Sequence, residues 1–371
     1  MSLHFHPLKV REVRLDTDEA VIVSFDVPPE LAETFRFTQG QYLTLRQEID
    51  GQDLRRSYSI CAGVDDGELR VGVRKVEGGR FSTWVNEQLK AGDVIQVFPP
   101  QGRFGQAREG AAQGTQDVVR EGGAGRHHLG IAAGSGITPI LSIMKTVLAR
   151  EPGSRFTLIY GNRRPASTMF KEEIEDLKNR YLTRVALHHV FSREATDAPL
   201  QSGRLDAGKL AAFFASLVPA AGIDEAYVCG PFEMNEAADA VLKASGVAED
   251  RIHVERFGTV EMQTGRPVPH EVREGDADAA LVTVIRDGVS REIEFTKADP
   301  SLLDAAARAG MDVPFSCKSG VCSTCRCKLL EGEVRMDKNF ALDKHEIAAG
   351  FILSCQAHAL TPRVVISFDE R

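Results

Sequence analysis

The sequence predicts a multi-domain protein, with an antiparallel β-barrel first, an α/β domain with a doubly wound parallel sheet second, and a smaller α+β domain last. Three observations support this. Residues 8–100 alternate apolar and polar positions between Gly and Asp turns, residues 128–257 alternate strand and helix patterns, and a group of closely spaced cysteines lies near the end. We expect domains at 1–105, 106–257 and 279–371, with a linker at 258–278.

The first domain contains short runs of apolar and β-branched residues, bounded by turn residues, that predict strands. A helical pattern, Phe81–Leu89, follows the glycine pair Gly78 and Gly79. The predicted strands are Ala20–Val27, Gln41–Glu48, Arg56–Ala62, Leu69–Val76 and Val94–Phe98.

In the second domain, apolar strand patterns alternate with helical ones, which is typical of a parallel sheet covered by helices. The preceding stretch, Gln106–Arg126, is rich in Gly, Ala and Gln and has no periodicity, so we expect a surface loop there. The predicted strands are Leu129–Ala133, Phe156–Tyr160, Val185–Phe191, Ala226–Cys229 and Ile252–Phe257, and the predicted helices are Pro139–Ala149, Phe170–Arg180, Ala207–Leu217 and Phe232–Ala244.

The third domain begins with two strand patterns, Leu281–Arg286 and Arg291–Phe295, joined through Asp287 and Gly288. A helix near Ser301–Ala309 follows. Residues 258–278, rich in Gly, Pro and charge, predict an extended linker that lets this domain move.

Composition limits the possible functions. The formal charge is −8 and no Lys/Arg run is present, so a nucleic-acid partner is not expected. The longest uncharged apolar run, Leu129–Met144, is shorter than the roughly 20 residues that span a bilayer, and Met1–Val13 does not resemble a signal peptide. We therefore expect a cytoplasmic protein with no membrane partner.

Four of the seven cysteines have the spacing C-x4-C-x2-C followed by a distant cysteine, which is typical of a plant-type [2Fe–2S] cluster. The predicted metal ligands are Cys317, Cys322, Cys325 and Cys355. A structural zinc site usually shows two short pairs of ligands, so it fits less well. Gly320 lets the backbone approach the cluster, and Ser316, Ser319, Ser323 and Thr324 offer hydrogen-bond donors to the sulfurs. Cys61, Cys229 and Cys327 are expected to be thiols, with Cys327 in the core.

Two segments of the first domain suit a flavin. On one strand, Arg56 provides a cation for a phosphate, Tyr58 a flat ring, and Ser59 a hydroxyl. Arg74 ends another strand, and Gly79 and Ser82 begin a helix whose free amides can bind a second anion. The alternative is a plain helix cap by Ser82, with Arg74 and Arg80 in solvent.

The second domain carries features that suit a dinucleotide at the ends of its strands. A glycine-rich turn joins the first strand to the first helix and contains Gly134, Gly136, Thr138 and Pro139. Many α/β proteins use such a turn only for packing. Cys229, Gly230 and Pro231 form the fourth turn, where the thiol can line the nicotinamide pocket, although a buried Cys is more often part of the core.

The second and third strands of this domain end at the ribose position of a doubly wound sheet. Arg163 follows the second strand, and Ser192 and Arg193 follow the third. A 2′-hydroxyl is usually held by an acidic residue at the end of the second strand, and this sequence has none there. These side chains favour NADPH, whereas solvated arginines would leave NADH possible.

Taken together, these motifs resemble the ferredoxin–NADP reductase superfamily with an appended plant-type ferredoxin domain. The resemblance implies a β-grasp fold for the last domain and FAD bound by Arg56, Tyr58, Ser59, Arg74, Gly79 and Ser82. It also implies that Ser59 lies near the hydride-accepting nitrogen and Cys229 near the nicotinamide. Glu255 and Phe257 match an acidic residue and an aromatic ring of the superfamily, although here the chain continues beyond them.

Within this superfamily, the domain order is similar to that of oxygenase reductases, in particular the type that serves phenylacetyl-CoA epoxidase. The resemblance implies that electrons pass from NADPH through FAD and the cluster to a partner oxygenase of phenylacetate degradation. Two alternatives remain open. One is an NADH-dependent reductase of a ring-hydroxylating dioxygenase or hybrid-cluster protein, and the other is a non-catalytic redox adaptor.

Overall fold

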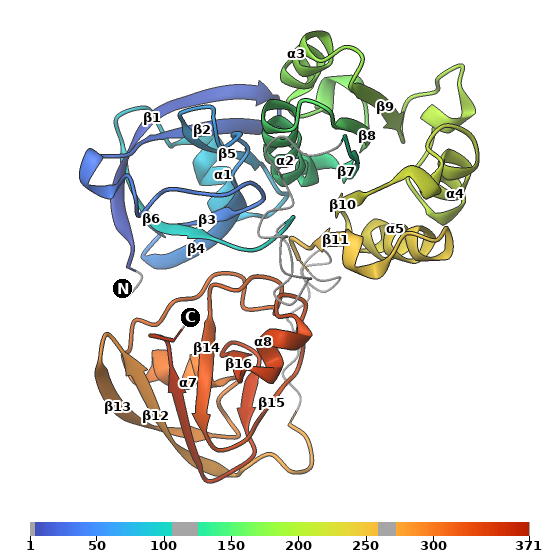
Figure 1. Cartoon of the computed structure of the whole chain (residues 1–371). Helices are drawn as coiled ribbons and strands as arrows, with labels where there is room; N and C mark the ends of the chain where they lie inside the picture. The colour runs from blue at the N-terminus through green and yellow to red at the C-terminus, as the bar shows by residue number, and fades with distance from the viewer. Residues whose placement is uncertain (1–3, 106–124, 259–271, 371) are drawn as a thin grey trace. The chain divides into compact units, whose positions relative to one another are not determined.

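The computed structural model describes residues 4–105, 125–258 and 272–370 (Figure 1). Most of the predicted loop Gln106–Arg126 and of the predicted linker 258–278 lies outside these residues. The contacts of the chain divide it into two units. One holds His6–Leu54 and Tyr58–Phe257, and the other holds Gly258–Arg371 together with Met1–Phe5 and Arg55–Ser57.

The first domain is an antiparallel sheet of six strands that closes on itself. The strand order is β4-β3-β6-β1-β2-β5, and a bridge between Ile60, just after β4, and Val71 of β5 joins the two edges. Closure removes the free edges of the sheet and confirms the predicted barrel. The elements are β1 (His6–Thr17), β2 (Ala20–Asp26), β3 (Tyr42–Ile49), β4 (Gln52–Ser59), β5 (Leu69–Arg74), α1 (Arg80–Glu87) and β6 (Val94–Gln101).

Strand β1 was not singled out from the sequence. Only Leu8 and Val10 of its twelve residues are buried, so it lacks the regular apolar alternation that predicts a strand. The strand forms because β2 and β6 pair with it on both sides.

The second domain is a parallel five-stranded sheet with the order β11-β10-β7-β8-β9. Helices α2 and α3 pack on one face and α4 and α5 on the other. This confirms the doubly wound fold, and it brings the carboxyl ends of all five strands to one edge. The elements are β7 (His127–Ala133), α2 (Ile137–Arg150), β8 (Arg155–Asn162), α3 (Lys171–Arg180), β9 (Val185–Phe191), α4 (Ala207–Ser216), β10 (Glu225–Cys229), α5 (Phe232–Ala244) and β11 (Ile252–Glu255).

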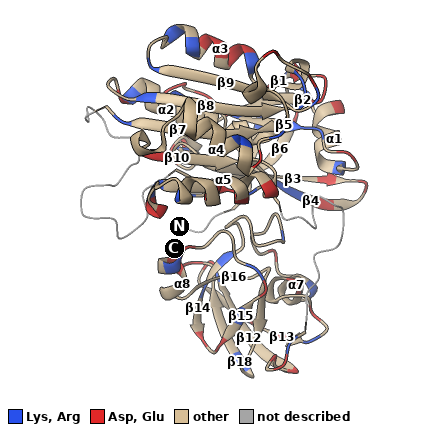
Figure 2. Ribbon diagram, turned by 90° about the vertical axis from the view of Figure 1, so that its right-hand side faces the viewer, with Lys and Arg blue, Asp and Glu red and all other residues tan. Residues whose placement is uncertain are grey.

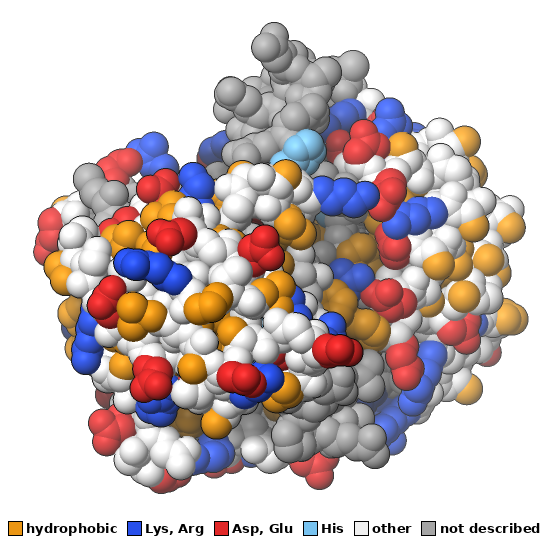
Figure 3. All heavy atoms as spheres, turned by 90° about the horizontal axis from the view of Figure 1, so that it is seen from below, with side chains coloured by type: hydrophobic (Ala, Val, Ile, Leu, Met, Phe, Trp, Pro, Cys, Tyr) orange, Lys and Arg blue, Asp and Glu red, His pale blue; other side chains and the backbone are white. Residues whose placement is uncertain are grey.

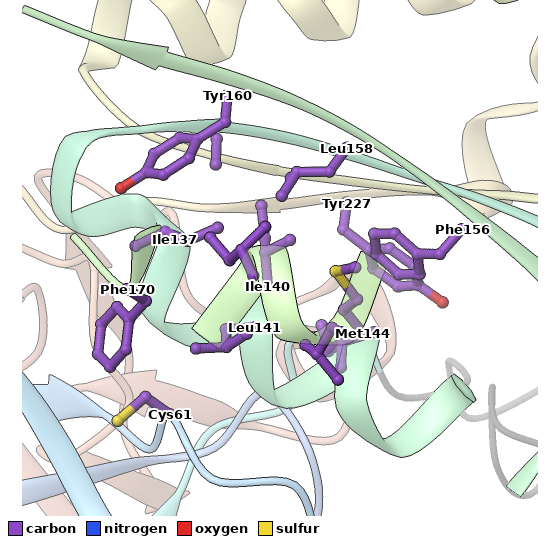
Figure 4. Packing of buried hydrophobic residues seen from close by; sticks show 14 of the residues in the cluster. Cys61, Ile137, Ile140, Leu141, Met144, Phe156, Leu158, Tyr160, Phe170 and Tyr227 are labelled. Atoms are coloured by element: carbon purple, nitrogen blue, oxygen red, sulfur yellow. The ribbon is translucent and has the colours of Figure 1, made fainter. Parts of the chain in front are cut away.

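Helix α2 is buried on nearly all sides. Ile140 and Met144 pack toward the parallel sheet, whereas Leu141 lies toward Cys61, which belongs to the barrel (Figure 4). The hydroxyl of Ser142 donates a 2.6 Å hydrogen bond to the carbonyl of Ala62 in the barrel. A helix that is apolar around its circumference needs cover on both sides, and here the sheet and the barrel provide it.

Helix α3 begins one residue later than predicted. Phe170 has a φ of 56° and precedes the helix, and its backbone N–H donates to the carboxylate of Asp16 at the end of β1. Acidic residues occupy the first turn of α3 and basic residues the last, as the helix dipole favours (Figure 2). The barrel therefore helps to fix the start of α3.

The last domain is a mixed sheet with the order β13-β12-β18-β14-β16 and a separate β15-β17 pair. Only β12 and β18 pair in parallel, and α7 packs its Leu and Ala side chains into the same core, which is the predicted β-grasp arrangement. Asp287 and Gly288 form the predicted turn with positive φ angles. The elements are β12 (Ala279–Arg286), β13 (Val289–Thr296), α7 (Leu302–Arg308), β14 (Arg326–Glu331), β15 (Val334–Met336), α8 (Lys344–Ala348), β16 (Phe351–Leu353), β17 (Ala357–Ala359) and β18 (Arg363–Ser367).

Acidic and basic side chains are mixed on the face seen in Figure 3, where no large area carries only one sign of charge. Among the described residues, no helix combines the length and the apolar character needed to cross a membrane.

The tight packing of the glycine-rich turn predicts a loss of stability for Gly136→Ala. A Cβ at this position would lie 2.0 Å from the carbonyl oxygen of Cys229, so backbone would have to move. We expect the variant to lose about 1–3 kcal/mol of unfolding free energy, as overpacked cores do. Scanning calorimetry of the transition of the barrel and α/β unit measures this loss.

The matched control is Gly208→Ala in α4, where the nearest atom to an added Cβ is 3.6 Å away. This change should be neutral or stabilising by up to about 1 kcal/mol, because alanine favours a helix over glycine. An equal change of unfolding free energy in Gly136→Ala and Gly208→Ala would contradict the packing argument.

Candidate active site and iron–sulfur centre

The start of helix α1 is shaped by a tight turn. Gly78 has a φ of 71°, and an added Cβ on Gly79 would lie 2.6 Å from the hydroxyl of Ser82. That hydroxyl donates to the carbonyl of Gly79 and accepts from the N–H of Val76, at 3.1 Å each. Ser82 therefore closes the turn, and Gly79, not Ser82, occupies the N-cap position of α1.

Strand β4 places the predicted flavin residues beside this helix. The ring of Tyr58 lies 6.1 Å from the ring of Phe81 in the first turn of α1, measured between centroids. Ser59 is buried at the end of β4, whereas Arg56 is exposed and donates to the carbonyl of Arg55. Tyr58 and the start of α1 are thus neighbours, as a flavin site spanning both would require.

A hollow of about 450 Å³ opens beside the same turn. Arg80 holds one wall in place, since its guanidinium donates to the carbonyl of Ile49 and pairs with Asp50 in the turn between β3 and β4. Trp84 stands one helical turn beyond Arg80. The hollow is lined by Glu48, Ile49, Asp50, Gly78, Gly79, Arg80, Thr83, Trp84 and Gln88.

Arg74, at the end of β5, reaches the edge of the parallel sheet. Its Nη2 donates to Glu19 at 2.9 Å, and its Nη1 lies 2.9 Å from the position that a Cβ on Gly134 would take. Arg74 is partly buried and pairs with Glu19, whereas Arg80 is exposed and pairs with Asp50. Arg74 lies where the barrel meets the glycine-rich turn.

The glycine-rich turn after β7 packs directly against the turn after β10. Gly134 has a φ of 54°, and Gly136 touches the backbone of Cys229 and Gly230 closely enough to exclude any side chain. The hydroxyl of Thr138 donates to the carbonyl of Ser135 at 2.9 Å. Pro139 is buried in the first turn of α2, where its missing N–H costs nothing.

The loops after β8 and β9 are joined by backbone hydrogen bonds. Ser192 N–H donates to the carbonyl of Asn162 at 2.9 Å, and Arg193 N–H to the carbonyl of Arg163 at 3.0 Å. Arg163, Ser192 and Arg193 are exposed, and both arginines, together with Arg74, lower the pKa of Glu19. The structure therefore places the loop of Arg163 beside the loop of Ser192 and Arg193, which lie about 30 positions further along the chain.

Cys229 and Glu255 are neighbours on adjacent parallel strands, at the ends of β10 and β11. Cys229 is fully buried, and Pro231, directly after Gly230, is the N-cap residue of α5. Phe257, two residues beyond β11, is exposed. Cys229 and Glu255 thus share the edge of the sheet that carries the glycine-rich turn.

Loss of hydration shifts the pKa of both groups, although Glu255 is only partly buried. Loss of hydration raises the pKa of the Cys229 thiol well above its usual range, and nearby Glu255 raises it further. Loss of hydration also raises the pKa of Glu255 to about 8, against an opposing effect of Arg256. At neutral pH the thiol is uncharged and the carboxyl is largely protonated, so this corner of the site carries little negative charge.

In the last domain, the four predicted ligands come together as two sulfur pairs. The Sγ atoms of Cys317 and Cys322 are 3.1 Å apart, and Cys325 is within hydrogen-bonding reach of Cys355. No group of three or more Cys, His, Asp or Glu side chains in the described ranges converges on a single ion. Two pairs suit a binuclear cluster, in which each iron takes two thiolates.

The surroundings of the sulfurs also fit a cluster. Ser319 N–H donates to Cys317 Sγ at 3.4 Å, and the Ser319 hydroxyl is buried without a partner among the described residues. Gly320 has a φ of 75°, and a Cβ there would meet the carbonyl of Lys338 at 2.9 Å. Cys327 is fully buried in the core, as predicted.

Two residues of these sites were missed by the sequence reasoning. Gln356 donates to the sulfur of Cys355 at 3.6 Å, and its position directly after the fourth cysteine was the available signal. Asn235 donates to the backbone at the ends of both β10 and β11. Nothing local marks Asn235, because its partners lie 5 and 20 residues away in sequence.

Comparison with known families assigns three consecutive domains. Residues 7–105 match the oxidoreductase FAD-binding domain, residues 131–240 the oxidoreductase NAD-binding domain, and residues 284–360 the 2Fe-2S iron-sulfur cluster binding domain.

Individual proteins match over nearly the whole chain. One of the subunits of the 1,2-phenylacetyl-CoA epoxidase of Escherichia coli K12 is 45% identical, with 99% of this chain and 98% of that protein covered. The ferredoxin reductase component of the 3-ketosteroid-9-alpha-monooxygenase of Rhodococcus rhodochrous is 32% identical, with 97% and 96% covered. The solved structure of phthalate dioxygenase reductase has a TM-score of 0.57 at 22% identity, with 98% of each chain covered, and shows the same fold.

The sulfur pairs predict separate effects of Cys322→Ser and Cys327→Ala. The first change removes one sulfur of a pair and should abolish the visible absorbance of the cluster, while the yellow flavin and NAD(P)H-dependent dye reduction remain. NAD(P)H-driven reduction of cytochrome c should fall at least tenfold. Cys327→Ala removes a thiol that belongs to the core and should keep both the absorbance and the activity. Loss of the cluster in both variants, or in neither, would contradict this ligand set.

The raised pKa of Glu255 predicts a pH-dependent effect of Glu255→Gln on stability. Between the usual glutamate pKa and about 8, the unfolded chain is ionised while the folded chain keeps the proton, so wild-type stability falls as pH rises. Glu255→Gln has no ionisable carboxyl at this position, so its stability does not fall in this way. Its melting temperature relative to wild type should therefore rise from pH 5 to pH 8 and then level off. Glu233→Gln, which removes an exposed carboxylate in α5, is the control and should not reproduce the rise. A flat difference for Glu255→Gln would contradict the shift.

Proposed function

Because this chain belongs to the family of oxygenase reductase components with FAD-binding, NAD-binding and [2Fe–2S] domains, we propose that it transfers electrons from NADPH to an oxygenase of the phenylacetyl-CoA epoxidase type. The observation that supports the acceptor is the full-length likeness to the Escherichia coli epoxidase protein. The preference for NADPH is supported by the residues of the second domain.

The flavin site uses residues from the barrel. Tyr58 would offer its ring as a platform, and the amides at the start of α1, next to Gly79 and Ser82, would bind phosphate oxygens together with Arg56. Ser59 would donate a hydrogen bond to the flavin ring. The hollow beside Trp84, which opens from the turn at Gly78 and Gly79, has room for another part of the cofactor. When bound, a flavin accepts a hydride and releases electrons singly.

The nicotinamide site uses the carboxyl edge of the parallel sheet. The glycine-rich turn at Gly134 and Gly136 leaves room for the pyrophosphate, with the start of α2 behind it. The uncharged thiol of Cys229 and the largely protonated Glu255 form an uncharged wall for the nicotinamide ring. The exposed ring of Phe257 is available to cover the flavin. Arg74, between the two sites, can pair with a phosphate from either cofactor.

NADPH is preferred to NADH because of the residues around the ribose position. Arg163, Ser192 and Arg193 are brought together by the backbone bonds between their loops and can donate to a 2′-phosphate. Arg74, Arg163 and Arg193 lower the pKa of Glu19 and so keep it ionised. The negative charge of Glu19 in turn weakens the attraction of these arginines for other anions. NADH lacks the 2′-phosphate, so Arg163, Ser192 and Arg193 do not strengthen its binding.

A direct test of the acceptor is reconstitution with purified oxygenase subunits. This protein, NADPH and the catalytic subunits of a phenylacetyl-CoA epoxidase should together oxidise phenylacetyl-CoA, and each omission should abolish product. A 3-ketosteroid monooxygenase oxygenase in place of the epoxidase is the specificity control. Turnover only with the control oxygenase would refute the assigned acceptor and leave the reductase activity intact.

The ribose site predicts how Arg193→Ala changes cofactor use. Losing one charge-assisted hydrogen bond costs about 1.5–3 kcal/mol. The KM for NADPH should therefore rise about 10- to 100-fold, with KM for NADH changed less than threefold. Steady-state dye reduction with each cofactor measures both values. The control Arg251→Ala removes an exposed arginine at the opposite end of β11 and should leave both constants unchanged. Equal rises for both cofactors would argue against phosphate recognition at Arg193.

A further inference from the structure

Asn235 is a buried amide that contacts two ends of the parallel sheet at once. It lies in the first turns of α5, and its side chain is fully buried. Its Nδ2 donates to the carbonyl of Gly230 at 3.2 Å and to the carbonyl of Glu255 at 3.0 Å. Because both neighbours are carbonyl oxygens, the amide must present its NH2 group to them. This fixes the orientation of the side chain.

The two carbonyls mark the points where β10 and β11 leave the sheet. The paired strands end at Cys229 and Glu255, and Gly230 is the first residue after β10. A carbonyl at the end of a strand can be satisfied by a side-chain donor. One side chain satisfies both and thereby links the turn after β10 to the end of β11.

The same turn is constrained from its other side. Gly136 contacts the carbonyl of Cys229, and Gly230 contacts Ala133 of β7 and the side chain of Met234. The contacts of Gly136 and Gly230 are steric, whereas Asn235 adds two side-chain hydrogen bonds. The amide oxygen Oδ1 has no hydrogen-bond partner among the described residues, so the side-chain hydrogen bonds given for Asn235 are the two that it donates.

We propose that Asn235 is a positioning residue that sets the separation of the Cys229 and Glu255 turns and thereby aligns the nicotinamide ring for hydride transfer. This inference rests on the proposed placement of the nicotinamide at these turns. Rates of transfer between bound groups fall steeply when the reacting atoms are displaced by even about 1 Å. Asn235 itself does not touch the reacting atoms.

The test compares Asn235→Leu with wild type by stopped-flow reduction of the flavin. Leucine has a similar size but cannot donate, so the two carbonyls lose their common partner. We expect hydride transfer from NADPH to slow at least tenfold, with the KM for NADPH changed less than threefold. With NADPH deuterated at the transferred position, the isotope effect on steady-state turnover should increase. Reduction of cytochrome c by dithionite-reduced protein should not change.

A matched control separates positioning from stability. Asn86 in α1 also donates its Nδ2 to two backbone carbonyls, those of Val73 and Ser82. Asn86→Leu should therefore reduce stability in a similar way without changing the isotope effect. Asn235→Asp gives a second readout, because its ionised form would repel both carbonyls and its protonated form would donate to one. Its flavin-reduction rate should recover toward wild type as pH falls.

The outcomes are distinct. A wild-type isotope effect in Asn235→Leu, or slowing equal to that of Asn86→Leu, would overturn the positioning inference while leaving the proposed function intact. Failure of wild-type protein to accept hydride from either NADPH or NADH would overturn the proposed function itself.

Discussion

The burial of helix α2 between the barrel and the parallel sheet is the constraint on which the two-cofactor unit depends. Apolar side chains on both sides of α2 hold the barrel against the parallel sheet. The hydrogen bond from Ser142 to the carbonyl of Ala62 fixes their relative position. The glycine-rich turn that begins at Gly134 leads directly into this helix. Consequently, the turn that is proposed to bind the nicotinamide nucleotide is attached to the same element that carries the barrel.

The close approach of backbones at the carboxyl edge follows from this packing. Gly136 contacts the backbone of Cys229 and Gly230, and Asn235 joins Gly230 to Glu255. The segments that follow β7, β10 and β11 are therefore in direct contact with one another. Loss of hydration keeps Cys229 and Glu255 largely uncharged at neutral pH, so the proposed nicotinamide wall would not repel a hydride donor. The arginines that we propose as cofactor ligands lie at the proposed phosphate and ribose positions.

The cluster domain is built differently, because it binds an inorganic group with few residues. A loop with glycine and serine at its centre carries three cysteines, and the fourth comes from the segment after β16. The sulfurs form two pairs, and donors from Ser319 and Gln356 reach them from the loop and from the residue after the last ligand. Such donors stabilise the added charge of the reduced cluster.

The sequence by itself determined the domain order, the fold classes and the presence of a [2Fe–2S] domain, since strand alternation, helix periodicity and cysteine spacing are local patterns. It also predicts the four cysteine ligands from their spacing, and the glycine-rich turn and the arginines from their positions at strand ends. It missed β1, which has only two buried residues and depends on its neighbours, and Asn235, whose partners are distant in sequence. Only the tertiary structure decided that Arg74 lies beside Gly134 and that Cys229 pairs with Glu255, because packing across the sheet and the barrel, not spacing along the chain, sets those contacts.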